Sequence, residues 1–263
     1  MTPFSHSARR RTRVLAIAAG AVTLIAAAVA NAQVVTRREP PRTSDAASGP
    51  ITTFVGGDLM YAQPQGDFKN YVNGAFGVGG HLIHSFDESR IVSLRVEGGY
   101  LNYGSTTNRQ ALGGGALGLI NVDVTTSNNI VFGALGLQLM APTGALRPYV
   151  SGSVGFSYFF TESSVEGTSN TQPFANTQNF SDGGFTGIWG GGIYIPIRSG
   201  GPNPISLDIG AQMHSNNDIK YLTKNSITIA NSSSQPVITP VRSAADFITF
   251  RIGVSVGVSL NGK

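Results

Sequence analysis

The sequence predicts an all-β protein, an eight-stranded antiparallel up-and-down β-barrel that crosses a membrane. Three observations predict it: alternating apolar and polar side chains, unusually long strands, and connections that alternate between short and long. The clearest strand is FITFRIGVSVGVSL at residues 247–260. There every even position is apolar, and every odd position after Phe247 is polar or glycine. Successive side chains of a strand point to opposite faces, so this strand has one apolar face and one polar face.

Seven earlier segments show the same alternation. All eight are at least 11 residues long. A strand tilted near 45° needs roughly 9–11 residues to cross a bilayer, whereas an average strand of a soluble protein has about 5–6 residues. The length therefore favours a membrane barrel over a soluble sandwich. The predicted strands are residues 52–62, 71–86, 91–103, 128–140, 149–161, 185–197, 205–215 and 247–260.

The connections between these strands predict the orientation of the barrel. Three are short, at residues 87–90, 141–147 and 198–204. The polar stretches 104–127, 162–184 and 216–246 predict long loops. Short turns at one end and long loops at the other are typical of bacterial outer-membrane barrels, with both chain ends on the periplasmic side.

Aromatic residues near the strand ends predict interfacial girdles. On the fifth strand, Tyr149 and Phe160 are separated by about the height of the apolar band of a membrane. The aromatic residues expected at the long-loop end are Tyr61, Tyr71, Tyr103, Phe185 and Phe247.

The first 32 residues read as a cleaved secretory signal peptide. A cluster of arginines precedes the apolar run VLAIAAGAVTLIAAAVA, and Ala30-Asn31-Ala32 fits the small-x-small cleavage rule. A retained membrane anchor is the alternative. Residues 33–50 are rich in proline, serine and charge and predict a flexible periplasmic linker. The barrel domain is predicted over residues 51–260.

Charge and cysteine content narrow the function classes. The first 32 residues hold four of the 18 basic residues and none of the 14 acidic ones, so the remainder carries 14 of each. This balance predicts no nucleic-acid partner. The chain has no cysteine, so we expect neither disulfides nor a lipid-modified cysteine.

The chain resembles the eight-stranded bacterial outer-membrane barrels of the OmpA/OmpX/OmpW type. The resemblance rests on the signal peptide, on the turn and strand LRPYVSGSVGF at residues 146–156, and on the final alternating strand. The end Leu260-Asn261-Gly262-Lys263 departs from the terminal aromatic residue usual in such chains. The resemblance implies contact with outer-membrane lipid and lipopolysaccharide and recognition by the barrel-insertion machinery, and we expect a monomer.

Several charged and amide side chains fall on the inward face of the predicted strands. An eight-stranded barrel is just wide enough to be filled by its side chains, and a buried charge must be paired. These residues therefore predict an internal polar network, with Arg251 paired to Glu97 or Asp58. Its predicted members are Asp58, Arg95, Glu97, Gln138, Asp208, Gln212 and Arg251. A polar conduit for a small solute is the alternative interpretation.

The sequence predicts neither a metal site nor a cofactor. His81 and His84 are three positions apart on one strand and so face opposite sides. His214, Ser215 and Asp218 lie at the long-loop end of a strand and suggest a hydrolase triad. Groups so close in sequence rarely reach triad geometry, so we do not expect an enzyme. We expect a structural or surface-interaction role through the extracellular loops, with an extracellular ligand that the sequence does not name. The alternatives are a narrow channel for small solutes, including hydrophobic ones, and a rim-sited enzyme.

Overall fold

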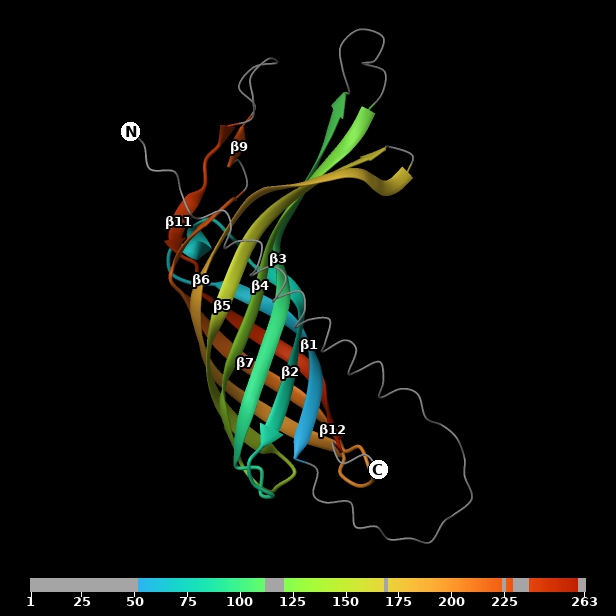
Figure 1. Ribbon diagram of the computed structural model, residues 1–263, viewed down its shortest axis with the longest axis vertical. Coiled ribbons are helices and arrows are strands. Elements are labelled where there is room, and N and C mark those ends of the chain that lie inside the picture. The colour runs from blue at the N-terminus through green and yellow to red at the C-terminus, as the bar shows by residue number, and fades with distance from the viewer. Residues whose placement is uncertain (1–51, 112–120, 168–169, 224–225, 229–236, 260–263) are drawn as a thin grey trace, which may run out of the picture.

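The computed structural model describes residues 52–111, 121–167, 170–223, 226–228 and 237–259. The predicted signal peptide (1–32) and linker (33–50) lie outside the described residues. Eight strands close into one antiparallel barrel in the order β1-β12-β7-β6-β5-β4-β3-β2, which confirms the predicted fold (Figure 1). The barrel strands are β1 (Thr53–Pro64), β2 (Ala75–Ser85), β3 (Val92–Ala111), β4 (Asn121–Met140), β5 (Arg147–Gly167), β6 (Asn170–Arg198), β7 (Ile205–Asn216) and β12 (Phe247–Val258).

The barrel closes where the first strand pairs with the last. Thr53 lies opposite Val258, and Pro64 lies opposite Phe247. Thr53 also pairs with His84, next to the short turn between β2 and β3. Both ends of the barrel domain are therefore at the short-turn end. Closure leaves no unpaired strand edge in the barrel wall, which a sheet surrounded by lipid requires.

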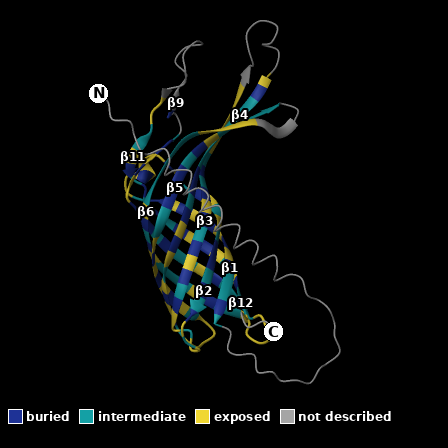
Figure 2. Cartoon of the chain, in the orientation of Figure 1, coloured by how far each residue is buried: buried dark blue, intermediate teal, exposed yellow. Residues whose placement is uncertain are grey.

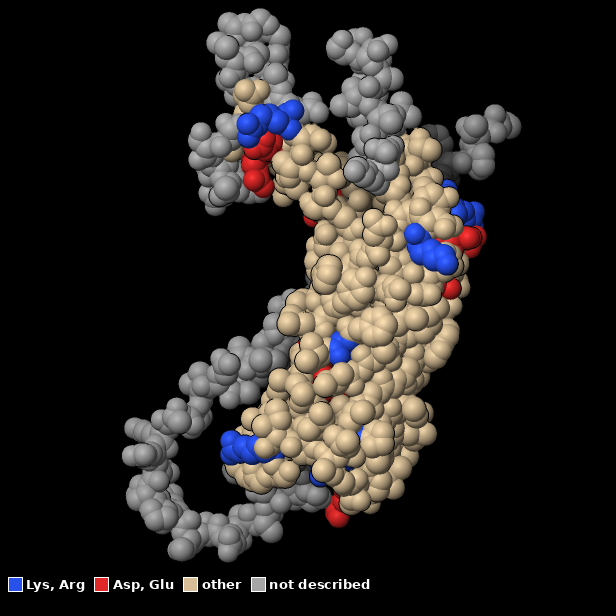
Figure 3. Space-filling model, turned by 180° about the vertical axis from the view of Figure 1, so that it is seen from behind, with Lys and Arg blue, Asp and Glu red and all other residues tan. Residues whose placement is uncertain are grey.

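The wall is apolar outside and polar inside. Buried and exposed residues alternate along the strands and give the barrel a chequered surface (Figure 2). Most of the wall seen in Figure 3 is free of charged side chains, which gather toward the two ends apart from a small blue and red patch at mid-height. Exposed apolar side chains come from every strand of the barrel, for example Leu59, Val78, Val96, Leu137, Val154, Ile193, Ile209 and Ile252.

Four strands continue beyond the barrel at the long-loop end. Pairing persists up to Ala111 with Asn121, Val122 with Gly167, and Gly167 with Asn170, so β3 to β6 form a protruding polar sheet. The prediction that residues 104–127 and 162–184 are loops was therefore wrong for their described parts. Beyond the membrane both faces of a sheet meet water, so the apolar alternation disappears while the backbone ladder continues.

The connections at the long-loop end cap the barrel. Between β1 and β2 lies the short 3₁₀ helix η1 (Phe68–Asn70). Between β7 and β12, β8 (Asp218–Tyr221) pairs with β11 (Val241–Ala244), and β9 (Ile227–Thr228) pairs with β10 (Val237–Ile238). In the described part of the chain, no helix is both long and apolar enough to span a bilayer.

The capping side chains fill the lumen from above. Phe68 of η1 is buried, and its ring lies 5.0–6.0 Å from the ring centres of Tyr103, Phe159 and Tyr221. The Tyr103 hydroxyl donates to the Leu222 carbonyl at 3.2 Å. The cap thus ties the wall to two separate connections, and it closes the long-loop end with apolar atoms.

The aromatic residues predicted at the long-loop end lie there, but they do not all face outward. Tyr61, Tyr71 and Phe185 are exposed, but Tyr103 and Phe247 are buried on the inner face. Tyr149, expected in an outer girdle, also points inward. Odd and even positions of a strand point to opposite sides, so a place near a strand end does not by itself make an aromatic residue face lipid.

Candidate functional site

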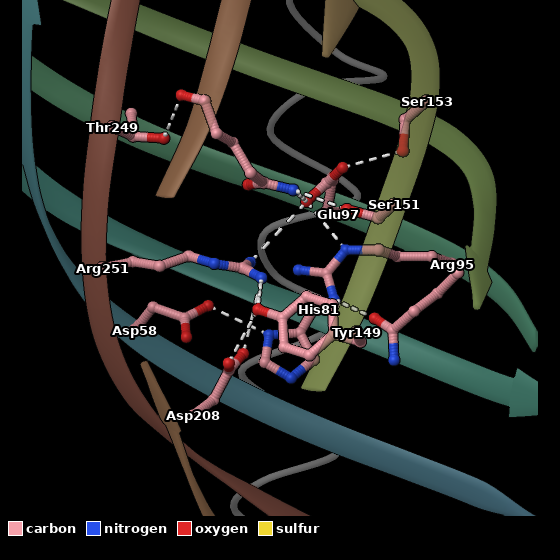
Figure 4. Close-up of polar contacts among 12 residues, drawn as sticks. Asp58, His81, Arg95, Glu97, Tyr149, Ser151, Ser153, Asp208, Thr249 and Arg251 are labelled. Carbon is pink, nitrogen blue, oxygen red and sulfur yellow. Dashed lines mark hydrogen bonds and ion pairs between the residues drawn. The ribbon is translucent and has the colours of Figure 1, made fainter. Parts of the chain in front are cut away.

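A cluster of buried polar side chains crosses the middle of the barrel (Figure 4). Its members come from β1, β2, β3, β4, β5, β7 and β12, because inward positions of different strands meet at the same height. All seven residues predicted for an internal network are buried: Asp58, Arg95, Glu97, Gln138, Asp208, Gln212 and Arg251.

Glu97 on β3 is the centre of the cluster. Its Oε2 accepts from Arg95 Nε at 2.9 Å and from Gln212 Nε2 at 3.0 Å. Its Oε1 accepts from Ser153 Oγ at 2.8 Å, and Arg251 Nη1 lies 3.8 Å from Oε2. Four strands, β3, β5, β7 and β12, therefore converge on one carboxylate, and both of its oxygens have partners.

Arg251 on β12 links Glu97 to a second carboxylate. Its Nη2 lies 3.5 Å from Asp208 Oδ2 and donates to the Tyr149 hydroxyl. Tyr149 in turn donates to Asp208 Oδ1 at 2.8 Å. Tyr149 is a member of the cluster that the sequence interpretation missed. The signal was available: Tyr149 shares the parity of the inward serines of its strand, Ser151 and Ser153.

Arg95 extends the cluster to the neighbouring strand β4. Its Nη1 donates to Gln138 Oε1 on β4 at 2.9 Å, while its Nε is held by Glu97. Gln212 also reaches Ser151 Oγ at 3.3 Å. These neutral amides and hydroxyls hydrogen-bond to the charged groups of the cluster. Such bonds are needed to keep ions inside a narrow lumen that holds little water.

Asp58 has a different partner from the one predicted. Its Oδ2 lies 3.0 Å from His81 Nδ1, and no ion pair joins it to Arg251 in the described residues. Two glycines make room for this pair, because a Cβ at Gly56 would collide with the imidazole and one at Gly253 would collide with the Asp58 carboxylate. Arg251 meets Asp208 instead, which lies on β7, the strand that pairs with β12.

Asp58, His81 and Asp208 each offer a metal-binding atom, and these atoms lie within 4.8 Å of one another. Carboxylates and imidazole are common ligands of transition metals. Here, however, His81 is bonded to Asp58 and Asp208 to Arg251 and Tyr149. Asp58 Oδ1 and His81 Nε2 have no hydrogen-bond partner in the described structure. The Arg251 guanidinium, however, already supplies the positive charge beside Asp208, and we assign no metal to the three residues.

The three residues considered for a hydrolase triad are not brought together. His214 is fully buried, stacks on Phe247 with 4.4 Å between ring centres, and contacts Thr249 Oγ1 at 3.2 Å. Ser215 occupies the next position and so points to the other side of the wall. Asp218 is exposed and lies 3.6 Å from Arg242. The histidine serves the apolar packing below the cap.

A second apolar layer lies below the cluster. Ile83, Met140, Tyr149 and Tyr194 form one buried group, with Phe54 packed against it. The described interior therefore has three levels: an aromatic cap, a charged middle and an apolar floor. This arrangement is suited to holding the wall together. Within the described cluster, no nucleophile is aligned with a base and a third group that orients the base.

No protein-family model and no curated protein sequence matches the chain. Among solved structures, the Neisserial surface protein A is similar, with 10% identity, a TM-score of 0.42, and coverage of 78% of this chain and 96% of that one. The Yersinia pestis attachment invasion locus protein Ail, solved with a heparin analogue, has 10% identity, a TM-score of 0.34, and coverage of 78% and 95%. The outer membrane protein AlkL has 12% identity, a TM-score of 0.33, and coverage of 86% and 99%.

At this level of identity and TM-score, these likenesses carry no argument about function. The class of the protein rests on its own strand pairing and burial. It is a closed, eight-stranded antiparallel β-barrel with an apolar outer wall and a polar, filled interior, which is the architecture of a transmembrane barrel.

Proposed function

We propose that the protein is an outer-membrane barrel of a diderm bacterium that acts through its polar extension above the membrane. The observation that carries the proposal is the contrast between a filled lumen and a large protruding sheet. With the protruding sheet outside the cell, the short turns and both ends of the barrel domain face the periplasm. The outer wall contacts lipid and lipopolysaccharide, and insertion depends on the barrel-insertion machinery.

The filled lumen supports a role other than conduction. The aromatic rings of Phe68, Tyr103 and Phe159 cross the barrel at the long-loop end. Below them the ion pairs of Glu97 and Arg251 occupy the centre. Small barrels are filled by side chains, whereas water-filled channels belong to barrels with many more strands. A solute would have to displace both levels to pass.

The protruding sheet supports an interaction role. Its hydroxyl and amide side chains bond across neighbouring strands, as in Thr107 with Thr125 at 2.9 Å and Thr126 with Ser163 at 2.8 Å. Arg109 and Asp123 form one surface ion pair at 3.0 Å. These contacts give the sheet a defined shape without an apolar core, and its exposed groups suit an uncharged, hydrogen-bonding partner. Polar elements on a rigid scaffold commonly carry binding.

Two measurements test the proposal. In planar bilayers the purified protein should show no steady single-channel steps, and such steps would instead support the narrow-channel function. In the second measurement, residues 106–126 and 163–177 are each replaced by an Asn-Gly turn, which suits a two-residue hairpin. The shortened barrel should still show heat-modifiable gel migration, but cells displaying it should lose adhesion that cells displaying the full-length protein have. Equal adhesion by both would contradict the interaction role.

A further inference from the structure

Three arginines surround a pocket at the short-turn mouth of the barrel. The pocket has a volume of about 220 Å³, far more than the roughly 15 Å³ that one water molecule needs. Its lining comes from β1, β5, β6, β7 and two short turns, so the pocket lies across the mouth of the lumen. The residues that matter here are Phe54, Arg90, Arg147, Arg198, Ser199 and Ser206.

Each guanidinium is held in place by a partner that does not neutralise it. Arg147 Nε donates to the Ala141 carbonyl at 3.0 Å, and Arg198 Nε donates to the Gly200 carbonyl at 3.3 Å. The Arg90 guanidinium lies over the Phe54 ring, 5.3 Å from its centre. Among the described residues, no carboxylate forms an ion pair with any of the three arginines.

One nitrogen of these three guanidinium groups is buried away from water and has no hydrogen-bond partner in the described structure. Arg147 Nη2 is buried and makes no hydrogen bond within the described structure. A buried donor of a charged group that lacks an acceptor is costly, so it marks the place where an acceptor from outside would bind. The pocket beside it is the space that such an acceptor would fill.

The backbone at Arg90 supports a specific use of this arginine. Arg90 has a φ of 59°, and it is the only described residue other than glycine with a positive φ. It closes the turn after Asp87, whose carbonyl accepts from the Arg90 amide at 3.1 Å. Glycine is the usual residue where a turn requires a positive φ. An arginine here accepts backbone strain and brings a third positive charge to the pocket.

We propose that this pocket, the arginine mouth, binds the oxyanion of a phosphate-type group. The fork of donors on a guanidinium matches two oxygens of such an anion, and several guanidiniums around one space favour multiple charges on it. Ser199 and Ser206 add hydroxyl donors to the lining. The apolar floor formed by Ile83, Met140 and Tyr194 lies between the mouth and the charged cluster, so the two sites are separate. The anion comes either from a soluble phosphate compound or from the headgroup of an anionic lipid.

The first experiment titrates inorganic phosphate into the full chain in a neutral detergent and a phosphate-free buffer, with calorimetry as the readout. The test variant is the double substitution Arg147→Gln with Arg198→Gln. Its matched control is Arg109→Gln with Arg242→Gln, which removes the same charge from the other end of the molecule. Wild type and control should bind equally, and the test variant should bind at least about tenfold more weakly.

A single substitution keeps the test valid if the double variant does not fold. Arg90→Asn suits the positive φ at this turn and removes one guanidinium. It should also weaken phosphate binding, with heat-modifiable migration on a gel unchanged.

The second experiment distinguishes the two sources of the anion. Wild type and the test variant are placed in nanodiscs of phosphatidylcholine alone or with phosphatidylglycerol, and retained lipids are counted by native mass spectrometry. If wild type alone retains phosphatidylglycerol, the ligand is a headgroup; if only phosphate binding differs, the ligand is soluble. Equal behaviour of wild type and test variant in both experiments would overturn the proposal.

Discussion

The carboxylate of Asp58 on β1 pairs with the imidazole of His81 on β2, with 3.0 Å between Oδ2 and Nδ1. Both side chains are buried in the lumen, and the two strands are neighbours in the wall. The pair leaves Arg251 to serve two other carboxylates, Glu97 and Asp208. The charged middle of the barrel therefore consists of two neighbouring groups of side chains, one that joins adjacent strands and one that spans the lumen.

Replacing Arg251 with alanine should destabilise the barrel far more than replacing Ser255. Arg251→Ala leaves the buried Asp208 without its cationic partner and weakens the environment of Glu97. Removing one partner of a buried ion pair costs about 3–5 kcal/mol. Ser255 is buried four residues further along β12, and its Oγ has no partner within the described structure, so Ser255→Ala should cost less than about 1 kcal/mol.

Urea unfolding of each variant in lipid vesicles measures this difference. The wild-type protein and Ser255→Ala are the references for Arg251→Ala. Similar unfolding free energies for the two variants would show that the ion pairs of Arg251 do not stabilise the folded barrel.

Replacing Gly56 with alanine should break the Asp58–His81 pair. A Cβ at Gly56 would overlap the His81 imidazole and approach the Val254 carbonyl to 2.9 Å. Overpacking of this kind costs about 1–3 kcal/mol. Gly152 also lies in a barrel strand, but a Cβ there meets nothing within 4 Å, so Gly152→Ala should be neutral or slightly stabilising.

The stability of both glycine variants is measured by the same urea unfolding, and the His81 ring is followed by its NMR signals. A Gly56→Ala protein as stable as Gly152→Ala, with unchanged His81 signals, would refute the packing argument.

Raising the pH above 10 should loosen the arm formed by β8 and β11. Burial raises the pKa of the Tyr221 phenol above its ordinary value, and its hydroxyl bonds with Ser243 Oγ at 2.8 Å. The folded arm therefore favours the neutral phenol. The stability that this contributes is complete below the unfolded pKa of about 10 and is lost as the pH rises through the folded pKa.

The difference in tyrosinate absorbance between wild type and Tyr221→Phe isolates this titration. Its midpoint should lie above that of a free tyrosine, and Tyr221→Phe should remove the alkaline loosening detected by limited proteolysis of the arm. A midpoint at or below 10 would contradict a buried phenol.

The barrel strands were predictable because the membrane imposes a strict pattern on them. Lipid on one side and a filled lumen on the other require alternating apolar and polar side chains. Even a single strand such as 247–260 therefore shows which face contacts lipid and which faces the lumen. The same parity places Arg95, Glu97 and Arg251 inside. Where the chain leaves the membrane, both faces of β3 to β6 meet water, and residues such as Thr107 and Thr125 carry no sign that they continue a strand.

The partners within the lumen were harder to predict than its members. The odd or even position of a residue shows that Asp58, His81 and Arg251 point inward. It does not show how far along the barrel axis each side chain lies, and so not which neighbours it contacts. That depends on the stagger between strands, which places Met60 rather than Asp58 opposite Arg251 across the β1–β12 seam. The arginine mouth was also missed, because Arg90, Arg147 and Arg198 lie in or beside turns far apart in the sequence.

The position of Arg251 has a consequence for assembly. It stands on β12, the strand that seals the cylinder against β1, and its guanidinium meets Tyr149 of β5 and Glu97 of β3 across the lumen. A slip of β12 by one residue would turn every side chain of that strand over and carry this charge into lipid. The buried ion pairs therefore select the register of the last strand: only the native alignment closes the cylinder with the Arg251 cation beside its carboxylate partners.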